Sequence, residues 1–428
     1  MDYELLPPAD QIVMTMDRIY GYGMTTTSGG NLSIREEGGD LWITPAGVDK
    51  GSLTPEDIMH VAADGTVTGP HRPSVELPFH QEIYRRRPDL RAIVHAHPPA
   101  LVAFSLVRRI PDTSLIPNMH RVCGEVGLAE YGLPGSGGLG EKIARVFAAG
   151  SSAVILENHG AVVGASDLRK AFMSFETLDF CARLEIDASR MGKPSGLSSR
   201  EIALSAQKQS VTLEEFTPSG HDAAERRARQ ELVALIRRAC DQKLFTSTQG
   251  TFSRRLGERS FLITPYLVDR KYLELGDLVR IDDGRREAGK TPSRSVRLHQ
   301  QIYARQPHVN AVIIAHPPSI MAFAVTSERF DSRTIPECYL MLRSVPKLPF
   351  GATFLDPEGT AAVFTPAVPL ALVQNDCAVV TGATLIQAFD RLEVAEYSAR
   401  ALVACRSLGE VVMIDASQVA ELDRAFGG

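Results

Sequence analysis

The spacing of apolar residues follows the same order twice along the chain. Apolar residues stand three and four positions apart after residue 10 and again after residue 230, which predicts an amphipathic helix at the start of each half. Each predicted helix is followed by a polar loop, short apolar runs stopped by proline, a second helix, a buried strand and a long closing helix. Strands and helices mixed in this way predict an α/β fold whose central sheet is covered by helices on both faces.

The repetition extends to the residues themselves, because Pro73–Pro99 recurs at a constant spacing as Pro292–Pro318. An internal repeat of this length fixes the domain organisation before any other inference. We therefore expect a tandem duplication with domains at 1–192 and 223–428. The segment between them, 193–222, is rich in Ser, Pro, Gly and charged residues and is expected to be a linker with one short helix at about 200–209.

Composition narrows the class of protein. The 428 residues, 44% of them hydrophobic, suffice for two domains that each bury a core. The net charge of −5 and the absence of a long basic run argue against nucleic acid as a partner. No apolar stretch reaches the roughly 20 residues that a membrane span needs, and the polar N-terminus is unlike a secretory signal. The six scattered cysteines are typical of reduced thiols, so we expect a cytoplasmic protein.

Three histidines of the first half stand in a pattern that predicts a metal site. His95 and His97 end an apolar run, and residues two apart on a strand face the same side. The two prolines that follow should place this pair at the edge of the sheet rather than its middle. His159 lies where another apolar run breaks into a turn. Together the three imidazoles could hold a divalent ion with an open position for substrate, and Glu76 could be a fourth ligand or a base.

The second half supplies an internal control, because it keeps the apolar pattern but has lost most of these polar groups. The fold therefore does not need them, which favours a chemical role in the first half. The replacements are Ser295 for Glu76, Ile314 for His95 and Asp376 for His159.

Other histidines are present in both halves and are interpreted as structural. His316 matches His97 but lacks its partners, so we expect a hydrogen-bonded structural residue. His80 and His299 occupy equal places and are expected to be structural as well.

At these residues the chain resembles the class II aldolase/adducin family. The motifs SGGNLSIR, ITPAG, PSVE, HAHP and ENHG stand in the family's order and at its spacings. They cover nearly all of Pro7–Lys193, whereas the second half resembles the family in outline only. The resemblance implies α/β/α domains with a largely antiparallel sheet, and a zinc ion on His95, His97 and His159. Mn²⁺ and Fe²⁺ remain open, because three imidazoles accept several divalent ions.

The resemblance also implies roles for residues around the metal. It makes Glu76 the catalytic acid/base. It places Gly30, Asn31, Gly47 and Ser74 around a phosphate group, which they would bind through backbone N–H groups and polar side chains.

Several positions depart from the phosphate-sugar aldolases of that family. Two hydroxyl donors are missing, because Ala46 and Val75 stand at their places, and Lys50 is either a compensating charge or a solvated loop residue. Where those aldolases use a tyrosine from a neighbouring subunit, this chain has His120 and Arg121. His120 could deliver a proton as a second catalytic residue and Arg121 could hold a carboxylate or phosphate, or each could be an interface residue.

The combined expectation is a metal-dependent carbon–carbon lyase. It would cleave a ketose or ketose phosphate by a retro-aldol reaction through a metal-stabilised enediolate. Epimerase, dehydratase and decarboxylase activities use the same metal and base and stay open, as does an adducin-like scaffold. Family members commonly form rings, so we expect a homo-oligomer that mimics a tetramer or a larger assembly. The second half would be a scaffold or would donate a side chain such as Tyr339, and neither nucleic acid nor membrane is an expected partner.

Overall fold

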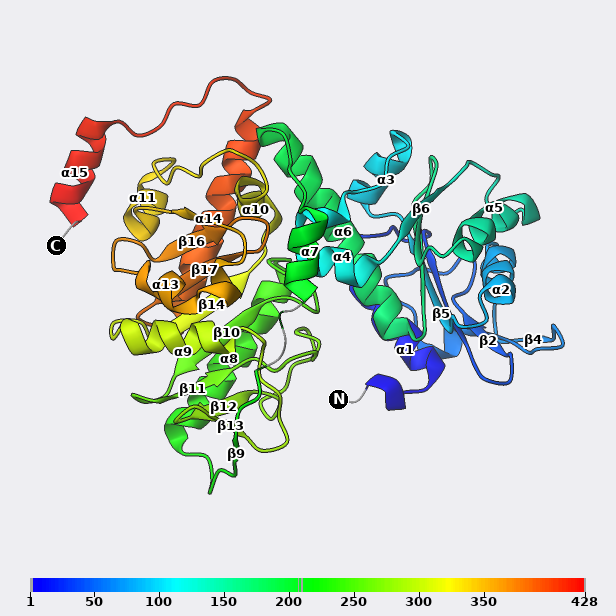
Figure 1. The fold of residues 1–428 in the computed structure, drawn as a ribbon. Coiled ribbons are helices and arrows are strands. Elements are labelled where there is room, and N and C mark those ends of the chain that lie inside the picture. Colours follow the sequence, from blue (N-terminus) through cyan, green and yellow to red (C-terminus); the bar gives the residue numbers. More distant parts are fainter. Residues whose placement is uncertain (1–2, 207, 209–210, 427–428) are drawn as a thin grey trace. The chain divides into compact units, whose positions relative to one another are not determined.

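The computed structural model describes residues 3–206, 208 and 211–426, and the chain divides into two units (Figure 1). Each unit contains one sheet and several helices, so the predicted α/β class is confirmed. The first unit comprises Met1–Thr113 and Asn118–Arg183, and the second comprises Ser114–Pro117 and Leu184–Gly428.

Among the described residues, the sheet of the first unit has eight strands in the order β4-β3-β2-β1-β5-β8-β7-β6. Neighbouring strands are antiparallel except β6 and β7, which are parallel. The strands are β1 (Asn31–Arg35), β2 (Leu41–Ile43), β3 (Met59–Val61), β4 (Val67–Thr68), β5 (Ala92–Ala96), β6 (Val126–Ala129), β7 (Ala153–Leu156) and β8 (Ala161–Ala165). The helices are α1 (Pro8–Gly21), α2 (Leu77–Arg86), α3 (Pro99–Leu106), α4 (Pro117–Cys123), α5 (Gly137–Ala148) and α6 (Leu168–Met191), with short 3₁₀ helices at Tyr3–Leu5, Pro55–Asp57 and Thr113–Leu115.

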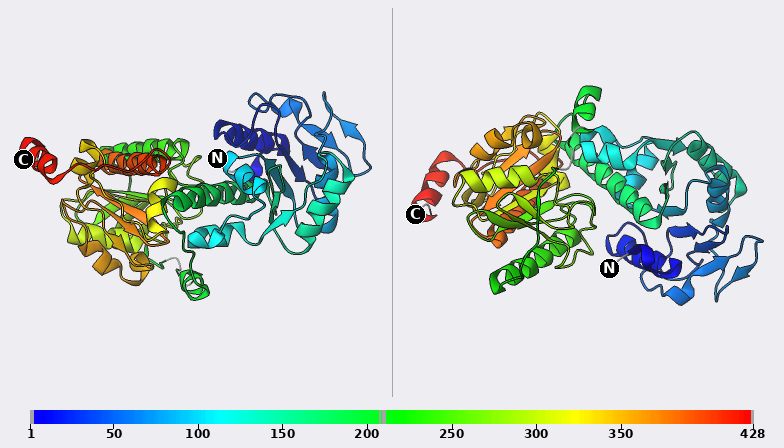
Figure 2. Two further views of the ribbon diagram at one scale, coloured as in Figure 1. Left: turned by 90° about the horizontal axis from the view of Figure 1, so that it is seen from above. Right: turned by 60° about the horizontal axis from the view of Figure 1, so that its bottom comes forward.

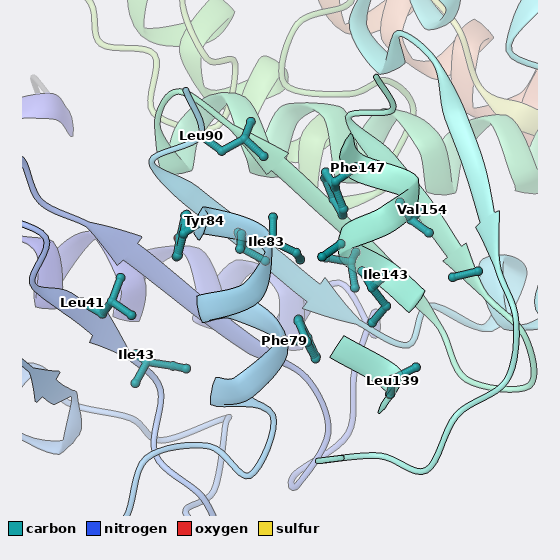
Figure 3. Close-up of a cluster of buried hydrophobic side chains, with 14 of the residues drawn as sticks. Leu41, Ile43, Phe79, Ile83, Tyr84, Leu90, Leu139, Ile143, Phe147 and Val154 are labelled. Carbon is teal, nitrogen blue, oxygen red and sulfur yellow. The ribbon is translucent and has the colours of Figure 1, made fainter. Parts of the chain in front are cut away.

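Helices cover both faces of this sheet, α2 and α5 on one side and α1 and α6 on the other (Figures 1 and 2). The apolar stripe predicted for α1 is buried, including Ile12, Met16 and Ile19. On the opposite face, Phe79 of α2 and Phe147 of α5 belong to a cluster that packs on the sheet (Figure 3). Burying large apolar side chains on both faces makes the sheet a rigid support for residues at its strand ends.

The second unit repeats this topology. Its sheet has the order β15-β16-β17-β14-β10-β11-β12-β13-β9, in which the segment from β16 to β13 follows the same path as β7 to β4. The strands are β9 (Glu215–Phe216), β10 (Thr251–Arg255), β11 (Ser260–Ile263), β12 (Val279–Asp282), β13 (Arg285–Glu287), β14 (Ala311–Ala315), β15 (Lys347–Leu348), β16 (Leu370–Val373) and β17 (Cys377–Gly382). The helices are α7 (Ser199–Ala206), α8 (Ala223–Asp241), α9 (Val296–Arg305), α10 (Pro318–Ala324), α11 (Pro336–Leu342), α12 (Ala352–Leu355), α13 (Pro357–Ala362), α14 (Leu385–Cys405) and α15 (Ala416–Phe426).

The segment 193–222, expected to be a linker, contains regular structure where the chain is described. It forms α7 and the strand β9, which pairs in parallel with β13 at one edge of the second sheet. No helix in the described part of the chain is both long and apolar enough to cross a membrane.

Candidate metal centre

The structure brings the three predicted histidines together at the end of strand β5. His95 lies within β5 and is fully buried, His97 follows the strand, and His159 lies in the turn between β7 and β8. The sequence places the histidine pair at the edge of the sheet, and this prediction is wrong. Strand β5 is central, with β1 and β8 paired on its two sides, and the prolines end the strand without making it an edge.

The geometry of the three imidazoles fits a divalent ion. One ring nitrogen from each residue lies within 4.8 Å of the others, and the Nε2 atoms of His95 and His97 are 3.1 Å apart. A tetrahedral site with metal–nitrogen bonds of 2.0–2.1 Å would separate two ligand nitrogens by about 3.4 Å. The Nδ1 atom of His95 lies 3.0 Å from the carbonyl oxygen of Ala161 and donates to it, so Nε2 is the ring nitrogen turned toward the cluster.

Two tight turns allow the histidines to approach each other. Asn158 adopts a positive φ of 54°, which asparagine tolerates, and Gly160 lies so close to β5 that a Cβ would meet Ala96 O and the His97 ring at 2.6 Å. Gly30 has a φ of 72°, and a Cβ there would lie 2.7 Å from His95 O. Glycine is therefore required at Gly30 both for its backbone conformation and for the close passage of β5.

Replacing Gly30 with alanine is expected to lower the free energy of unfolding by about 2 kcal/mol or more, since it combines backbone strain with a steric clash. Gly23 provides a matched control, because its φ is 65° but a Cβ added there would meet no atom within 4 Å. Gly23→Ala should cost only about 1 kcal/mol. Urea denaturation of both variants measures the difference, and equal losses would refute the proposed close contact.

Glu76 stands next to the histidines and is the N-cap residue of α2. Its Oε2 atom lies 3.2 Å from His95 Nε2 and its Oε1 atom lies 3.6 Å from His159 Nε2. The residue is only 6% exposed, and Oε1 is buried without a hydrogen-bond partner in the described part of the chain. A buried oxygen left unsatisfied costs free energy, so its position beside the ring nitrogens fits a site that takes up a cation or a substrate group.

Burial and neighbouring charges set the protonation states of His97, His159 and Glu76. Burial, with the neighbouring His95 and His159, lowers the pKa of His97 to about 3, and burial with His95 lowers the pKa of His159 to about 4. Both imidazoles are therefore neutral at pH 7 and can act as ligands. Burial alone raises the pKa of Glu76, but His95, Asn31 and His159 together hold it below its usual range, so the carboxylate is ionised.

A chain of buried hydrogen bonds leads from Glu76 into the core, and the sequence pattern contains no indication of it. Asn31 is the cross-strand neighbour of His95, and its Nδ2 atom donates to Glu76 Oε2 at 2.7 Å. His80 Nε2 lies 2.5 Å from Asn31 Oδ1, and His80 Nδ1 lies 2.7 Å from the hydroxyl of Ser33. Tyr84 completes the chain, 2.8 Å from the same hydroxyl. The period-two spacing of β1 places Asn31 and Ser33 on one face, but only the structure shows what α2 presents to them.

The residues expected to bind phosphate differ from one another in their local contacts. The Ser74 hydroxyl accepts a hydrogen bond from the backbone N–H of Glu76 at 3.3 Å, and Gly47 has a φ of 71° with open space around it. Lys50 is neither a compensating charge in the cluster nor a solvated residue. It is only 3% exposed, and its Nζ donates to Pro45 O at 2.8 Å and Val48 O at 3.0 Å.

The matching residue of the second unit shows that this role is structural. Arg270 is also buried and donates to Gly250 O at 3.0 Å and to Val268 O. A buried cation in the same loop of both repeats holds the backbone of the turn, because the loop carbonyls need donors.

His120 and Arg121 lie on α4. Among the described residues neither makes a hydrogen bond or ion pair with the cluster, and Arg121 donates to Asn118 at 2.6 Å. Tyr339 of α11 donates to Asp423 of α15 at 3.0 Å, so its hydroxyl is engaged within its own chain.

The second unit has hydroxyl groups where the first has its acid and amide. Thr251 and Ser293 lie 2.8 Å apart, Ser293 and Ser295 lie 3.0 Å apart, and the three hydroxyls bond to one another. His316 is buried as expected, and its Nδ1 atom has no hydrogen-bond partner among the described residues. In the described part of the chain, the group of histidines, cysteines or carboxylates that could hold a metal is His95, His97 and His159.

Comparison with known proteins identifies the family of this chain. A family model described as Class II Aldolase and Adducin N-terminal domain matches residues 10–186 and again 230–403. A 5-deoxy-D-ribulose 1-phosphate aldolase of Bacillus thuringiensis is 33% identical over 211 residues, which are 46% of this chain and 93% of that protein. A 3-oxo-tetronate 4-phosphate decarboxylase of Escherichia coli is 35% identical over 166 residues, which are 38% of this chain and 78% of that protein. A solved L-fuculose 1-phosphate aldolase is 31% identical with a TM-score of 0.43, covering 47% of this chain and 95% of that one. The chain belongs to the class II aldolase and adducin family, whose domain it carries twice in tandem.

Proposed function

We propose that the first unit is a metal-dependent lyase that cleaves a ketose phosphate by a retro-aldol reaction. The observation that carries this proposal is the position of Glu76, an ionised and buried carboxylate 3.2 Å and 3.6 Å from ring nitrogens of His95 and His159. The relatives named as sugar-phosphate aldolases support the substrate class.

His95, His97 and His159 would hold the ion, which is Zn²⁺ or another divalent metal such as Mn²⁺ or Fe²⁺. When bound, such an ion polarises the substrate carbonyl and hydroxyl oxygens and stabilises the negative charge that develops as the carbon–carbon bond breaks. Glu76 acts as the acid/base. It delivers the proton that the carbanionic carbon of the ketone fragment takes up, while a second base receives the proton of the substrate hydroxyl that becomes the aldehyde oxygen.

The remaining residues would position the substrate and complete the proton transfers. Backbone N–H groups around Gly30 and Gly47, with Asn31 and Ser74, would receive the phosphate. His120 and Arg121 would act in an assembled homo-oligomer, His120 on a proton and Arg121 on an anionic substrate group. We propose the second unit as a degenerate copy that binds no catalytic metal and contributes to a pseudo-tetramer or larger assembly.

Decarboxylation is the second candidate, because relatives named 3-oxo-tetronate 4-phosphate decarboxylase are 32–36% identical to this chain. Loss of CO₂ from a 3-oxo acid also leaves a carbanion that must be stabilised and then protonated. The same histidines and Glu76 would serve both reactions, so only the leaving group differs.

A substrate screen tests the proposal. The purified full chain, supplied with Zn²⁺, Mn²⁺ or Fe²⁺, is incubated with ketose 1-phosphates, free ketoses and 3-oxo acid phosphates. Release of an aldehyde and a three-carbon phosphate from a ketose 1-phosphate is the expected result. Release of CO₂ would select the second candidate, and absence of turnover with every metal and substrate class would contradict the lyase assignment.

A further inference from the structure

In the buried chain of hydrogen bonds behind Glu76, each step has a defined donor and acceptor. The ring of His80 fixes which atom of the Asn31 amide faces Glu76. We propose that His80 is a positioning residue, which holds the amide of Asn31 in the one orientation that donates a hydrogen bond to Glu76. This inference rests on the proposed function only in taking Glu76 as the acid/base. It goes beyond the purely structural role that the sequence pattern predicts for His80.

The direction follows from the donors and acceptors in the chain. The Asn31 atom 2.7 Å from Glu76 Oε2 is the amide nitrogen, which can only donate, and the amide oxygen, which can only accept, faces His80. His80 Nε2 must then carry the proton and donate to that oxygen. Burial, with His95 nearby, lowers the pKa of His80 to about 3, so the ring is neutral and carries a single N–H. Its Nδ1 atom therefore accepts from the hydroxyl of Ser33, which in turn can accept from Tyr84.

Without the His80 donor, the Asn31 amide would lose its preferred orientation. A flipped amide places its oxygen against the carboxylate of Glu76 and its N–H₂ group against the N–H of His80, and both contacts are repulsive. The imidazole thus excludes the flip, and it is fully buried, so no water competes for the position. Glu76 keeps a donor on Oε2, while Oε1 stays without a partner among the described residues and faces His159.

The second unit contains the same inner part of the chain without its outer end. His299 Nδ1 lies 2.6 Å from the hydroxyl of Ser253, which lies 2.7 Å from the hydroxyl of Tyr303. Its Nε2 atom is buried with no partner in the described residues, because Thr251 stands at the place of Asn31 and bonds to Ser293. The hydrogen bonds among serine, histidine and tyrosine therefore belong to the fold of both repeats. Only in the first repeat are they connected, through Asn31, to the carboxylate of Glu76.

This difference gives a matched experiment in the full chain. Glutamine at position 80 can present an N–H close to the place of Nε2, whereas asparagine reaches only the place of Nδ1. His80→Asn is expected to lower kcat by about tenfold or more, with less than about threefold change in KM and unchanged metal content. His80→Gln should stay within about threefold of the wild-type kcat. His299→Asn and His299→Gln should have wild-type kcat, with losses of thermal stability similar to those of the His80 variants.

A wild-type kcat in His80→Asn, or equal impairment in His80→Asn and His80→Gln, would overturn the inference. Glu76→Gln separates it from the proposed function. Full activity in Glu76→Gln rejects the acid/base role itself, whereas an inactive Glu76→Gln beside a fully active His80→Asn rejects only the positioning role.

If His80→Asn does not fold, the inference can be tested by a measurement that needs no enzymatic activity. Nitrogen-15 NMR of ring-labelled wild-type protein, assigned by the signal missing in His80→Gln, reports which ring nitrogen carries the proton. The inference requires a neutral ring protonated at Nε2. A ring protonated at Nδ1 would reverse the chain of hydrogen bonds and end the proposal.

Discussion

Replacing His97 with alanine is expected to abolish binding of the proposed divalent ion and to lower kcat/KM by about a thousandfold or more. The change deletes one of three imidazole ligands, and a bound metal ion typically contributes several kcal/mol of transition-state stabilisation. Each 1.36 kcal/mol corresponds to a factor of ten in rate. His97 is only partly buried, so its loss should leave the core intact. Metal content by mass spectrometry and turnover on the substrate found in the screen are the two measurements.

His316 is the matched control, because it occupies the place of His97 in the second repeat. His316→Ala should keep the wild-type metal content and turnover. Metal retained in His97→Ala, or metal lost in His316→Ala, would show that the ion does not lie where the first-repeat histidines converge.

Replacing Glu76 with glutamine is expected to lower kcat by about 10²–10⁴-fold, the usual contribution of a general acid or base. The amide has the size of the carboxyl group but cannot transfer a proton. The three histidines are unchanged, so metal content should equal that of the wild-type protein. Turnover assays with metal analysis of the same samples make the test, and an unchanged kcat would remove Glu76 from the mechanism.

Most of the fold can be predicted from the sequence, because periodic burial leaves a local signal. The stripe of Ile12, Met16 and Ile19 predicts α1, and the apolar run before His95 predicts β5. The pairing of strands leaves no such signal. The prolines after the histidine pair favour the edge of the sheet, whereas β5 pairs on both sides. Pairing partners are distant in sequence, and local patterns do not specify them.

The residues of the candidate site that differ between the two repeats can be predicted from the sequence. Those that are the same in both repeats are missed. His95, His159 and Glu76 stand out because the second repeat lacks them. His80 is present in both repeats, so comparison of the repeats assigns it to the fold, although its Nε2 has a partner in one repeat and none in the other. Lys50 stands in a polar loop, and its burial depends on how that loop folds back.

The most direct test of the metal centre is to locate the ion in crystals of the full chain. An anomalous difference map recorded at the absorption edge of the bound metal should contain one strong peak per chain. We predict that this peak lies about 2.0–2.1 Å from a ring nitrogen of each of His95, His97 and His159. A peak elsewhere, or none in crystals grown with equimolar metal, would contradict the assignment of the three histidines as a metal centre.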